Sequence, residues 1–378
     1  MLLRNGTEFF PQLCADIDAA QHSIYLETYI FAADMTGHMV AGALQRAATR
    51  GVAVRVMLDG FGSSELPQRW VDDMRTAGIE VLWYRRKISP LTLRRSRLRR
   101  LHRKLAVMDG EAAFIGGVNI VDDIPAGGNL AASRLDYAVR VQGVLAGEIH
   151  AAMRHLWGMV SWANLHRRIR MLGRRLADED GRKDAADLVL ALRDNLRHRH
   201  DIERAYVQAI AGAKREIIIA NAYFLPGRAF RRVLVQAAKR GVRVMMLLQG
   251  KVEYRLQHYA THALYDRLLA AGVEIYEYQA SYLHAKVAVV DGQWATVGSS
   301  NIDPYSLLLA REANLVVRDA GFAGELRESL LVAIDNDAIR IGEGYGDVPG
   351  GWYRLVARLC YGAMRLLVAL GYRRRGLP

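Results

Sequence analysis

An internal repeat constrains this chain more than any other feature of its sequence. One copy, Leu101–Ile120, is LHRKLAVMDGEAAFIGGVNI, and the other, Leu283–Asp303, is LHAKVAVVDGQWATVGSSNID. Four polar residues of the first copy recur 182 residues later, namely His102 as His284, Lys104 as Lys286, Asp109 as Asp291 and Asn119 as Asn301. A repeat of this kind indicates two copies of one structural unit.

Each copy has the pattern of a β-hairpin, which the second copy illustrates. His284 and Lys286 stand two residues apart, so in a pleated strand their side chains point to the same face. Asp291 and the glycine after it tolerate the positive φ angles of a tight turn. The returning strand then brings Ser299 and Asn301 back beside the histidine and the lysine. The sequence therefore predicts that each hairpin presents His, Lys and Asn to one point.

This group of side chains is typical of phosphate chemistry. A neutral imidazole can attack phosphorus or move a proton near neutral pH. Lysine and asparagine place charge and hydrogen-bond donors around the phosphate oxygens as negative charge develops. Two copies supply two histidines, one to attack and one to protonate the leaving oxygen. The alternative, in which each histidine is a structural strand residue, has to hold in both copies at once.

These residues resemble the phospholipase D superfamily, whose motif is His-x-Lys, four residues, Asp, six residues, then Gly-Gly/Ser-x-Asn. Both copies match that spacing. The second continues as NIDPYSLLLAREAN from Asn301, which is similar to bacterial cardiolipin synthases of the short, peripheral type. The resemblance covers residues 5–340 approximately and implies chemistry without a metal or another cofactor. The catalytic residues that it implies are His102, Lys104, Asp109, His284, Lys286 and Asp291.

The resemblance also implies supporting residues around the two motifs. In the family, a carboxylate in the strand after each motif orients the histidine, which carries over to Glu312 for His284 and to Asp136 for His102. The residues implied to hold or support the phosphate are Asn119, Ser299 and Asn301, with Gly117 in the serine position of the first copy. Asp109 and Asp291 belong to the motif, but their place in the sequence predicts that they mainly fix the hairpin turns.

Strands and helices alternate around both motifs. Strands are expected at 23–31, 52–59 and 79–84 with helices between them, and the strands at 216–226, 241–248 and 272–278 repeat this order. Such alternation predicts a parallel or mixed sheet. The fold expected is therefore α/β, with two phospholipase D-like α-β-α sandwich halves related by a pseudo-twofold axis, plus basic amphipathic helices.

The expected boundaries follow from the repeat and from changes in composition. They are 1–165 for the first half, 166–196 for a basic and polar linker, 197–342 for the second half, and 343–378 for a C-terminal basic amphipathic helix. In this last segment Arg354, Arg358 and Arg365 recur at helical spacing among apolar residues. This pattern fits a helix at a membrane interface, and the alternative is a helix docked on the protein itself or on a second copy.

The composition limits the partners and the compartment. The net charge of +13 favours an anionic partner, either a membrane surface or nucleic acid. Residues 85–100 carry eight Arg or Lys and no acid just before the first motif, which favours an anionic headgroup or phosphodiester there. The two cysteines, Cys14 and Cys360, have no metal-ligand spacing and suit a reducing compartment. No apolar run long enough to span a bilayer is present.

The resemblance implies a peripheral enzyme on the cytoplasmic face of a bacterial inner membrane. Its reaction would convert two phosphatidylglycerol molecules into cardiolipin and glycerol through a phosphatidyl-histidine intermediate, with His102 as the nucleophile. A phosphodiesterase or nuclease acting on nucleic acid is the alternative, since the basic segments suit it equally. A binding protein with an inactive site is a third. The phosphatidyl acceptor, whether a phospholipid, an alcohol or water, stays open, as does the oligomeric state.

Overall fold

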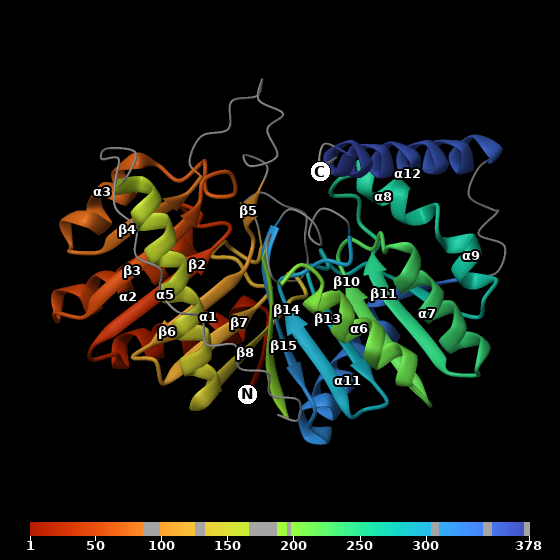
Figure 1. The fold of residues 1–378 in the computed structure, drawn as a ribbon, viewed down its shortest axis with the longest axis horizontal. Helices are drawn as coiled ribbons and strands as arrows, with labels where there is room; N and C mark the ends of the chain where they lie inside the picture. Colours follow the sequence, from red (N-terminus) through yellow and green to blue (C-terminus); the bar gives the residue numbers. More distant parts are fainter. Residues whose placement is uncertain are drawn as a thin grey trace.

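The computed structural model describes residues 1–85, 99–124, 133–165, 187–194, 198–303, 310–342 and 350–373. The chain forms two α/β halves that lie side by side (Figure 1). Most of the basic segment expected at 85–100 and most of the polar part of the expected linker, at 178–186, lie outside the described residues, as do the last two arginines of the chain.

The first half is a mixed sheet with helices on both faces. Its strands lie in the order β1-β8-β7-β6-β2-β3-β4, with β2, β3 and β4 parallel and the other neighbours antiparallel. The strands are β1 (Leu2–Arg4), β2 (Ser23–Thr28), β3 (Ala53–Asp59), β4 (Glu80–Tyr84), β6 (Lys104–Met108), β7 (Ala112–Gly116) and β8 (Tyr137–Gln142). The helices are α1 (Asn5–Ala19), α2 (Met35–Thr49), α3 (Gln68–Thr76) and α5 (Val144–Leu165). Gly51 (φ 90°) and Gly78 (φ 91°) turn the chain from helix to strand in a conformation that other residues rarely adopt.

The second half repeats this arrangement. Its sheet runs β16-β12-β11-β10-β13-β14-β15, and β15 pairs in addition with β9 and with β5 (Arg100–Leu101) from the first half. The strands are β9 (Leu188–Arg193), β10 (Glu216–Asn221), β11 (Arg243–Gln249), β12 (Glu274–Tyr278), β13 (Lys286–Val290), β14 (Trp294–Gly298), β15 (Ala310–Val317) and β16 (Ala338–Ile341). The helices are α6 (Asp201–Gly212), α7 (Arg228–Lys239), α8 (Arg255–His262), α9 (Tyr265–Leu269) and α11 (Ala320–Asp337).

The second half begins earlier than the sequence predicts. Strand β9 (Leu188–Arg193) lies inside the stretch expected to be a linker, 166–196, yet it pairs antiparallel with β15 along its whole length. β1 pairs in the same way with β8 and likewise precedes the first helix of its half. Strand β9 is therefore the first strand of the second unit, and the linker ends before it.

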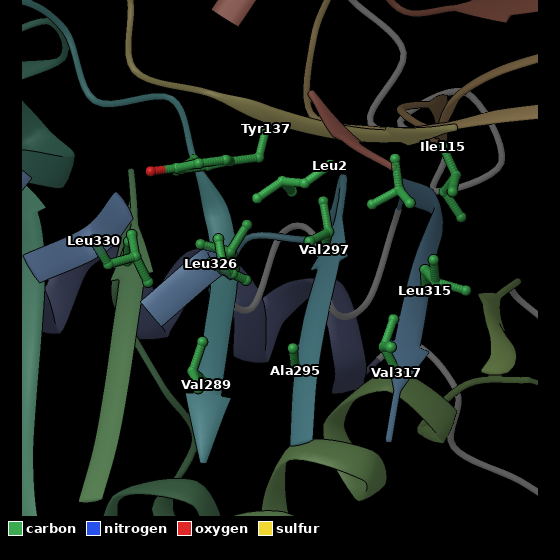
Figure 2. Close-up of a cluster of buried hydrophobic side chains, with 14 of the residues drawn as sticks. Leu2, Ile115, Tyr137, Val289, Ala295, Val297, Leu315, Val317, Leu326 and Leu330 are labelled. Atoms are coloured by element: carbon green, nitrogen blue, oxygen red, sulfur yellow. The ribbon is translucent and has the colours of Figure 1, made fainter. Parts of the chain in front are cut away.

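A shared hydrophobic core joins the two halves. Figure 2 shows Leu2, Ile115 and Tyr137 from the first half packed against Val297 and Leu315 from the second. Helices α5 and α11 add apolar side chains to this core from the inner faces of the two sheets. Burying one large apolar side chain contributes about 1.5–3 kcal/mol, so a core of this extent holds the halves as one body.

The outer faces of the sheets are covered by the remaining helices. In the first half, α1, α2 and α3 pack on β2, β3 and β4 around a core of their own. In the second half, α6, α7, α8 and α9 cover β10 and β11 in the same way. Each half is thus an α-β-α sandwich, as expected from the sequence.

The C-terminal helix α12 (Gly350–Arg373) packs along α8 at one edge of the second half (Figure 1). Tyr353, Ala357 and Cys360 face the protein, and the Tyr353 hydroxyl lies 2.6 Å from Nδ1 of His262. Trp352 and Leu359, on the other side of the helix, are 73% and 61% exposed. Among the described residues, no helix is long and apolar enough to cross a bilayer.

Candidate active site

The hairpin of each motif is held by its aspartate. Asp109 and Asp291 both have φ 54° and the glycine after each also has positive φ, as expected for tight turns. The Asp109 carboxylate accepts hydrogen bonds of 2.7–2.8 Å from the backbone N–H groups of Gln21, His22 and Ser23, where the chain enters β2. Asp291 does the same for β10. Burial alone would raise the pKa of each carboxyl, but these hydrogen-bond donors hold that pKa below its usual value. Asp109 lies five residues beyond Lys104, roughly 16 Å along a strand, so it is positioned at the turn and not beside the histidine and the lysine.

Each histidine is placed by an exchange of backbone between the halves. Strand β5 pairs in parallel with the start of β15, and a bridge joins the residue before His284 to Leu135. The N–H of His102 donates to the carbonyl of Arg311 at 3.0 Å, and the N–H of His284 donates to the carbonyl of Leu135 at 2.9 Å. The two catalytic segments therefore cross between the halves at equivalent points.

The carboxylate that each histidine meets belongs to the other half. His102 Nδ1 lies 3.0 and 3.1 Å from the two oxygens of Glu312, and His284 Nδ1 lies 2.6 Å from Oδ2 of Asp136. The expected pairs, Glu312 with His284 and Asp136 with His102, are wrong. The reason is the backbone exchange, because the residue that accepts each histidine N–H immediately precedes the carboxylate. With Nδ1 held in this way, Nε2 of each ring is available for a substrate.

Two buried lysines lie beside the histidines. Lys104 Nζ donates to the carbonyl of His102 at 2.7 Å, and Lys286 Nζ donates to the carbonyl of His284. Burial, with the neighbouring charge of Lys286 acting in the same direction, lowers the pKa of Lys104 to about 7. Burial lowers the pKa of Lys286 to about 8. A bound anion would reverse this effect, so the site favours an anionic ligand.

The histidines are neutral in the free protein. Burial lowers the pKa of His284 to about 3, with Lys286 acting in the same direction and Asp136 opposing it. Burial also lowers the pKa of His102 against the opposing charge of Glu312. Lysines from both halves act on each ring, so the two motifs lie close to each other. A neutral imidazole can act as a nucleophile, and an anion bound between the rings would raise their pKa values and allow protonation.

The serine position differs between the two motifs. Ser299 Oγ donates to Oε2 of Glu312 at 2.6 Å and accepts the N–H of Ala313, so its hydroxyl proton is directed to the carboxylate rather than to a substrate. A Cβ at Gly117 would lie only 2.2 Å from Oδ1 of Asp136. The shorter aspartate side chain therefore occupies the space that serine would need in the first half.

The two asparagines lie in the same cluster. Asn119 Oδ1 accepts the N–H of Ile30 at 3.2 Å, whereas Oδ1 of Asn301 is buried without a hydrogen-bond partner. Because the oxygen and nitrogen of an amide exchange places when the side chain flips, this position can offer a donor to an anion. Among the described residues, no three His, Cys, Asp or Glu side chains gather to hold a metal ion.

Two buried side chains that sequence reasoning missed hold the histidine segments in place. Asp59 Oδ2 accepts the N–H of Leu101 at 2.8 Å, and Gln249 Oε1 accepts that of Leu283 at 2.7 Å. Both residues end parallel strands, and the carboxyl ends of parallel strands are where sites in α/β sheets form. Because both strands were expected from the sequence, their last residues could have been identified as candidates for the site.

Arg193 and Tyr29 complete the surroundings of His102. Arg193 lies opposite Glu312 in the pairing of β9 with β15, and burial lowers its pKa to about 10 while Glu312 opposes the shift. Its positive charge favours the ionised carboxylate. The Tyr29 ring lies 4.8 Å from the ring of His102, and Nζ of Lys104 lies 5.3 Å from the same tyrosine ring. Neither residue stands in a repeated motif, so no sequence pattern indicated them.

The fold is shared with two proteins of known structure. The crystal structure of phosphatidylserine synthase from Haemophilus influenzae Rd KW20 matches with a TM-score of 0.70 at 12% identity, covering 97% of this chain and 94% of that one. The polyphosphate kinase of Porphyromonas gingivalis matches with a TM-score of 0.61 at 15% identity, covering 97% of this chain and 53% of that one. These likenesses establish the architecture alone.

The sequence comparisons are more specific. Residues 13–123 and 206–331 match the family model described as "Cardiolipin synthase, PLD-like domain". Cardiolipin synthase B of Salmonella typhi is 40% identical over 90% of this chain and 82% of its own length, and that of Escherichia coli K12 is 38% identical over the same shares. A probable cardiolipin synthase of Bacillus subtilis is 28% identical over 84% of this chain and 62% of its own. The chain belongs to the cardiolipin synthase family of phospholipase D-like proteins.

Proposed function

We propose that the protein transfers a phosphatidyl group from one phosphatidylglycerol to another, which yields cardiolipin and glycerol. The observation that carries the proposal is the pair of crossed histidine–carboxylate dyads beside two buried lysines. This cluster provides two imidazoles with free Nε2 atoms and a positive environment for one phosphodiester.

In the first step, Nε2 of His102 attacks the phosphorus. An N–P bond forms, the P–O bond to glycerol breaks, and His284 gives a proton to the departing oxygen. In the second step, His284 takes the proton from a hydroxyl of another phosphatidylglycerol, whose oxygen attacks the phosphorus as the N–P bond breaks. The side chains that surround the non-bridging oxygens are Lys104, Lys286, Asn119 and Asn301. Ser299 acts through Glu312.

We further infer that the enzyme lies on the cytoplasmic face of a bacterial membrane and docks there through α12. The outer side of α12 exposes Trp352 and Leu359 together with Arg354 and Arg358, a combination that suits an anionic lipid surface. Exposed apolar residues near the start of α8, along which α12 packs, extend this surface. The two cysteines are free, which fits a reducing compartment.

The test is incubation of the purified protein with phosphatidylglycerol vesicles, without added metal, followed by lipid mass spectrometry. Cardiolipin and glycerol should form with the wild type and be absent with His102→Ala and His284→Ala. His155→Ala is the matched control, because His155 is exposed on α5 and belongs to neither motif. Phosphatidic acid as the product would make water the acceptor. Cleavage of DNA or RNA with no lipid turnover would contradict the proposal in favour of a nuclease.

The role of each histidine can be tested with an aryl phosphodiester, whose leaving group needs no proton. His284→Ala should still form a phosphohistidine and release a burst of the phenolate, whereas His102→Ala should form neither. The reverse result would exchange the two roles.

A further inference from the structure

A polar hollow opens beside His284 and has no part in the steps described above. It lies where β10 and β11 end. Polar side chains on its wall include Tyr223, Gln249, Glu253 and Thr261. The backbone N–H of Ala222, also in the wall, donates to the carbonyl of the residue between His284 and Lys286, at 3.1 Å. The hollow therefore adjoins the catalytic cluster directly.

Gln249 leaves one unmet donor in this wall. Its side chain is only 8% exposed, and its Oε1 accepts the N–H of Leu283, the residue before His284. Its Nε2 is buried without a hydrogen-bond partner. A buried donor of this kind costs about 1–3 kcal/mol when it stays unsatisfied, so a ligand that accepts its hydrogen bond is favoured.

Glu253 gives the hollow an acceptor and sets the charge of its ligand. The Tyr223 hydroxyl donates to its carboxylate, and the negative charge of Glu253 also acts on Lys286. The positive charge of Lys251, which is also in the wall, offsets that of Glu253, so a neutral ligand fits, and a hydroxyl group can donate to Glu253 and accept from Gln249 at once. The wall thus suits a neutral ligand with more than one hydroxyl.

The first half offers no equivalent wall at the corresponding positions. Asp59, which matches Gln249 in strand register, accepts hydrogen bonds from three backbone N–H groups. Ser63 follows Asp59 by four residues, as Glu253 follows Gln249. Its hydroxyl donates to the carbonyl of Tyr29 and accepts a hydrogen bond from the N–H of Phe31. These side chains bind their own backbone, so the polar hollow distinguishes the His284 side of the site.

We propose that the hollow is a diol subsite, formed by Tyr223, Gln249 and Glu253, that binds the vicinal diol of a glycerol headgroup. The inference rests on the proposed function and deepens it by naming where the headgroup lies. A diol held here is next to His284, so His284 supplies the proton to its oxygen as the P–O bond breaks. The attacking nitrogen then comes from the opposite side of phosphorus, from His102, and forms the N–P bond.

Binding can be measured without turnover by saturation-transfer NMR on the whole protein with free glycerol, 1,2-propanediol, 1-propanol and ethanolamine as probes. The two diols should receive saturation from the wild type, and Glu253→Gln should weaken their binding by about tenfold. Glu325→Gln, which removes the same charge from an exposed position on α11, is the control and should bind as the wild type does. Equal signals from 1-propanol and the diols would overturn the subsite, as would stronger binding of ethanolamine.

Turnover provides a second readout with the same alcohols added to phosphatidylglycerol vesicles. The ratio of phosphatidyl-diol to phosphatidyl-propanol should be about tenfold or more in favour of the diol, and Glu253→Gln should reduce it toward one. Lipid turnover without this preference would overturn the diol subsite and leave the proposed function intact. Absence of any lipid turnover by the wild type would instead overturn the proposed function, and the NMR result would then decide the subsite alone.

Discussion

In the first half a glycine lies against a short carboxylate, whereas in the second half a serine donates to a long one. Gly117 has no side chain and so leaves room for Asp136. In the second half the longer side chain of Glu312 leaves room for Ser299, which donates a hydrogen bond to it. Because the dyads are crossed, the glycine–aspartate pair orients His284 and the serine–glutamate pair orients His102. The chemical difference between the halves is thus expressed at the histidine of the opposite half.

The two histidines are therefore held differently by their carboxylates. His284 makes one hydrogen bond of 2.6 Å to Asp136, while His102 lies 3.0–3.1 Å from both oxygens of a glutamate that also binds Ser299. The polar hollow adds to the difference, since it lies on the side of His284. A fixed proton donor and a more weakly held nucleophile match the roles assigned to the two rings.

Loss of either carboxylate should produce the largest effect. Glu312→Gln and Asp136→Asn should each lower kcat by about 10²- to 10⁴-fold, because the histidine loses its fixed tautomer. In ¹⁵N spectra of labelled histidine, Glu312→Gln should shift the Nδ1 signal of His102 alone, and Asp136→Asn that of His284 alone. A shift at the histidine of the same half would contradict the crossing.

Exchange of the small residue should have a smaller effect. Gly117→Ser should lower kcat by about 10- to 100-fold, because the new Cβ displaces Asp136 from His284. Adding Asp136→Glu converts the first half to the set found in the second and should restore most of the activity. Gly147→Ser, at a position with open space on α5, is the control. Failure of the double variant to recover would mean that carboxylate length and serine are not matched.

The lysines should make stability depend on pH in a defined direction. Their pKa values are about 7 for Lys104 and about 8 for Lys286 in the folded protein, against 10.5 for an ordinary lysine. Between these values the unfolded chain holds more protons than the folded one, so the free energy of unfolding should rise as pH increases from 7 to 10. Urea denaturation at several pH values should show this rise.

Two variants and one ligand separate the contributions of the two lysines to the pH dependence of stability. Lys104→Met should remove the part of the rise that begins near pH 7, and Lys286→Met the part that begins near pH 8. Inorganic phosphate should reduce the rise, because a bound anion restores the charged amines. Lys239→Met, an exposed change on α7, should leave the profile unaltered. A flat profile in the wild type would contradict the depressed pKa values.

The turn aspartates should give the smallest effect on activity, and an equal one in both halves. Asp109→Ala and Asp291→Ala each remove an acceptor of three backbone N–H groups and should lower the free energy of unfolding by about 1–3 kcal/mol. The kcat of the folded protein should stay within about threefold of the wild type. A large loss of kcat with unchanged stability would instead place these residues in the chemistry.

Much of the fold and site could be predicted from the sequence because the repeat is local. Spacing within one hairpin is enough to bring His284, Lys286 and Asn301 together, and the turn at Asp291 follows from its Asp-Gly pair. Alternating strands and helices gave the two sandwiches for the same reason, since each helix-to-strand turn is built from adjacent residues.

What could not be predicted depends on contacts between distant segments. Which carboxylate meets which histidine is decided by β5 joining the opposite sheet, and no spacing within one copy encodes that exchange. Strand β9 was hidden because it follows a long polar stretch, although its first five residues are all apolar. Gln249 and Glu253 stand outside the repeated motif, so their alignment beside His284 appears only in three dimensions.

The exchange of the histidine segments between the halves couples the evolution of the two copies of the repeat. Neither copy of the repeat can be discarded, because each leaves its histidine without the carboxylate that the other encodes. Two fragments expressed separately should be inactive, and activity should return only when both are present in one cell. A substitution near Asp136 is felt at His284, so the two copies are under joint selection and have to drift together.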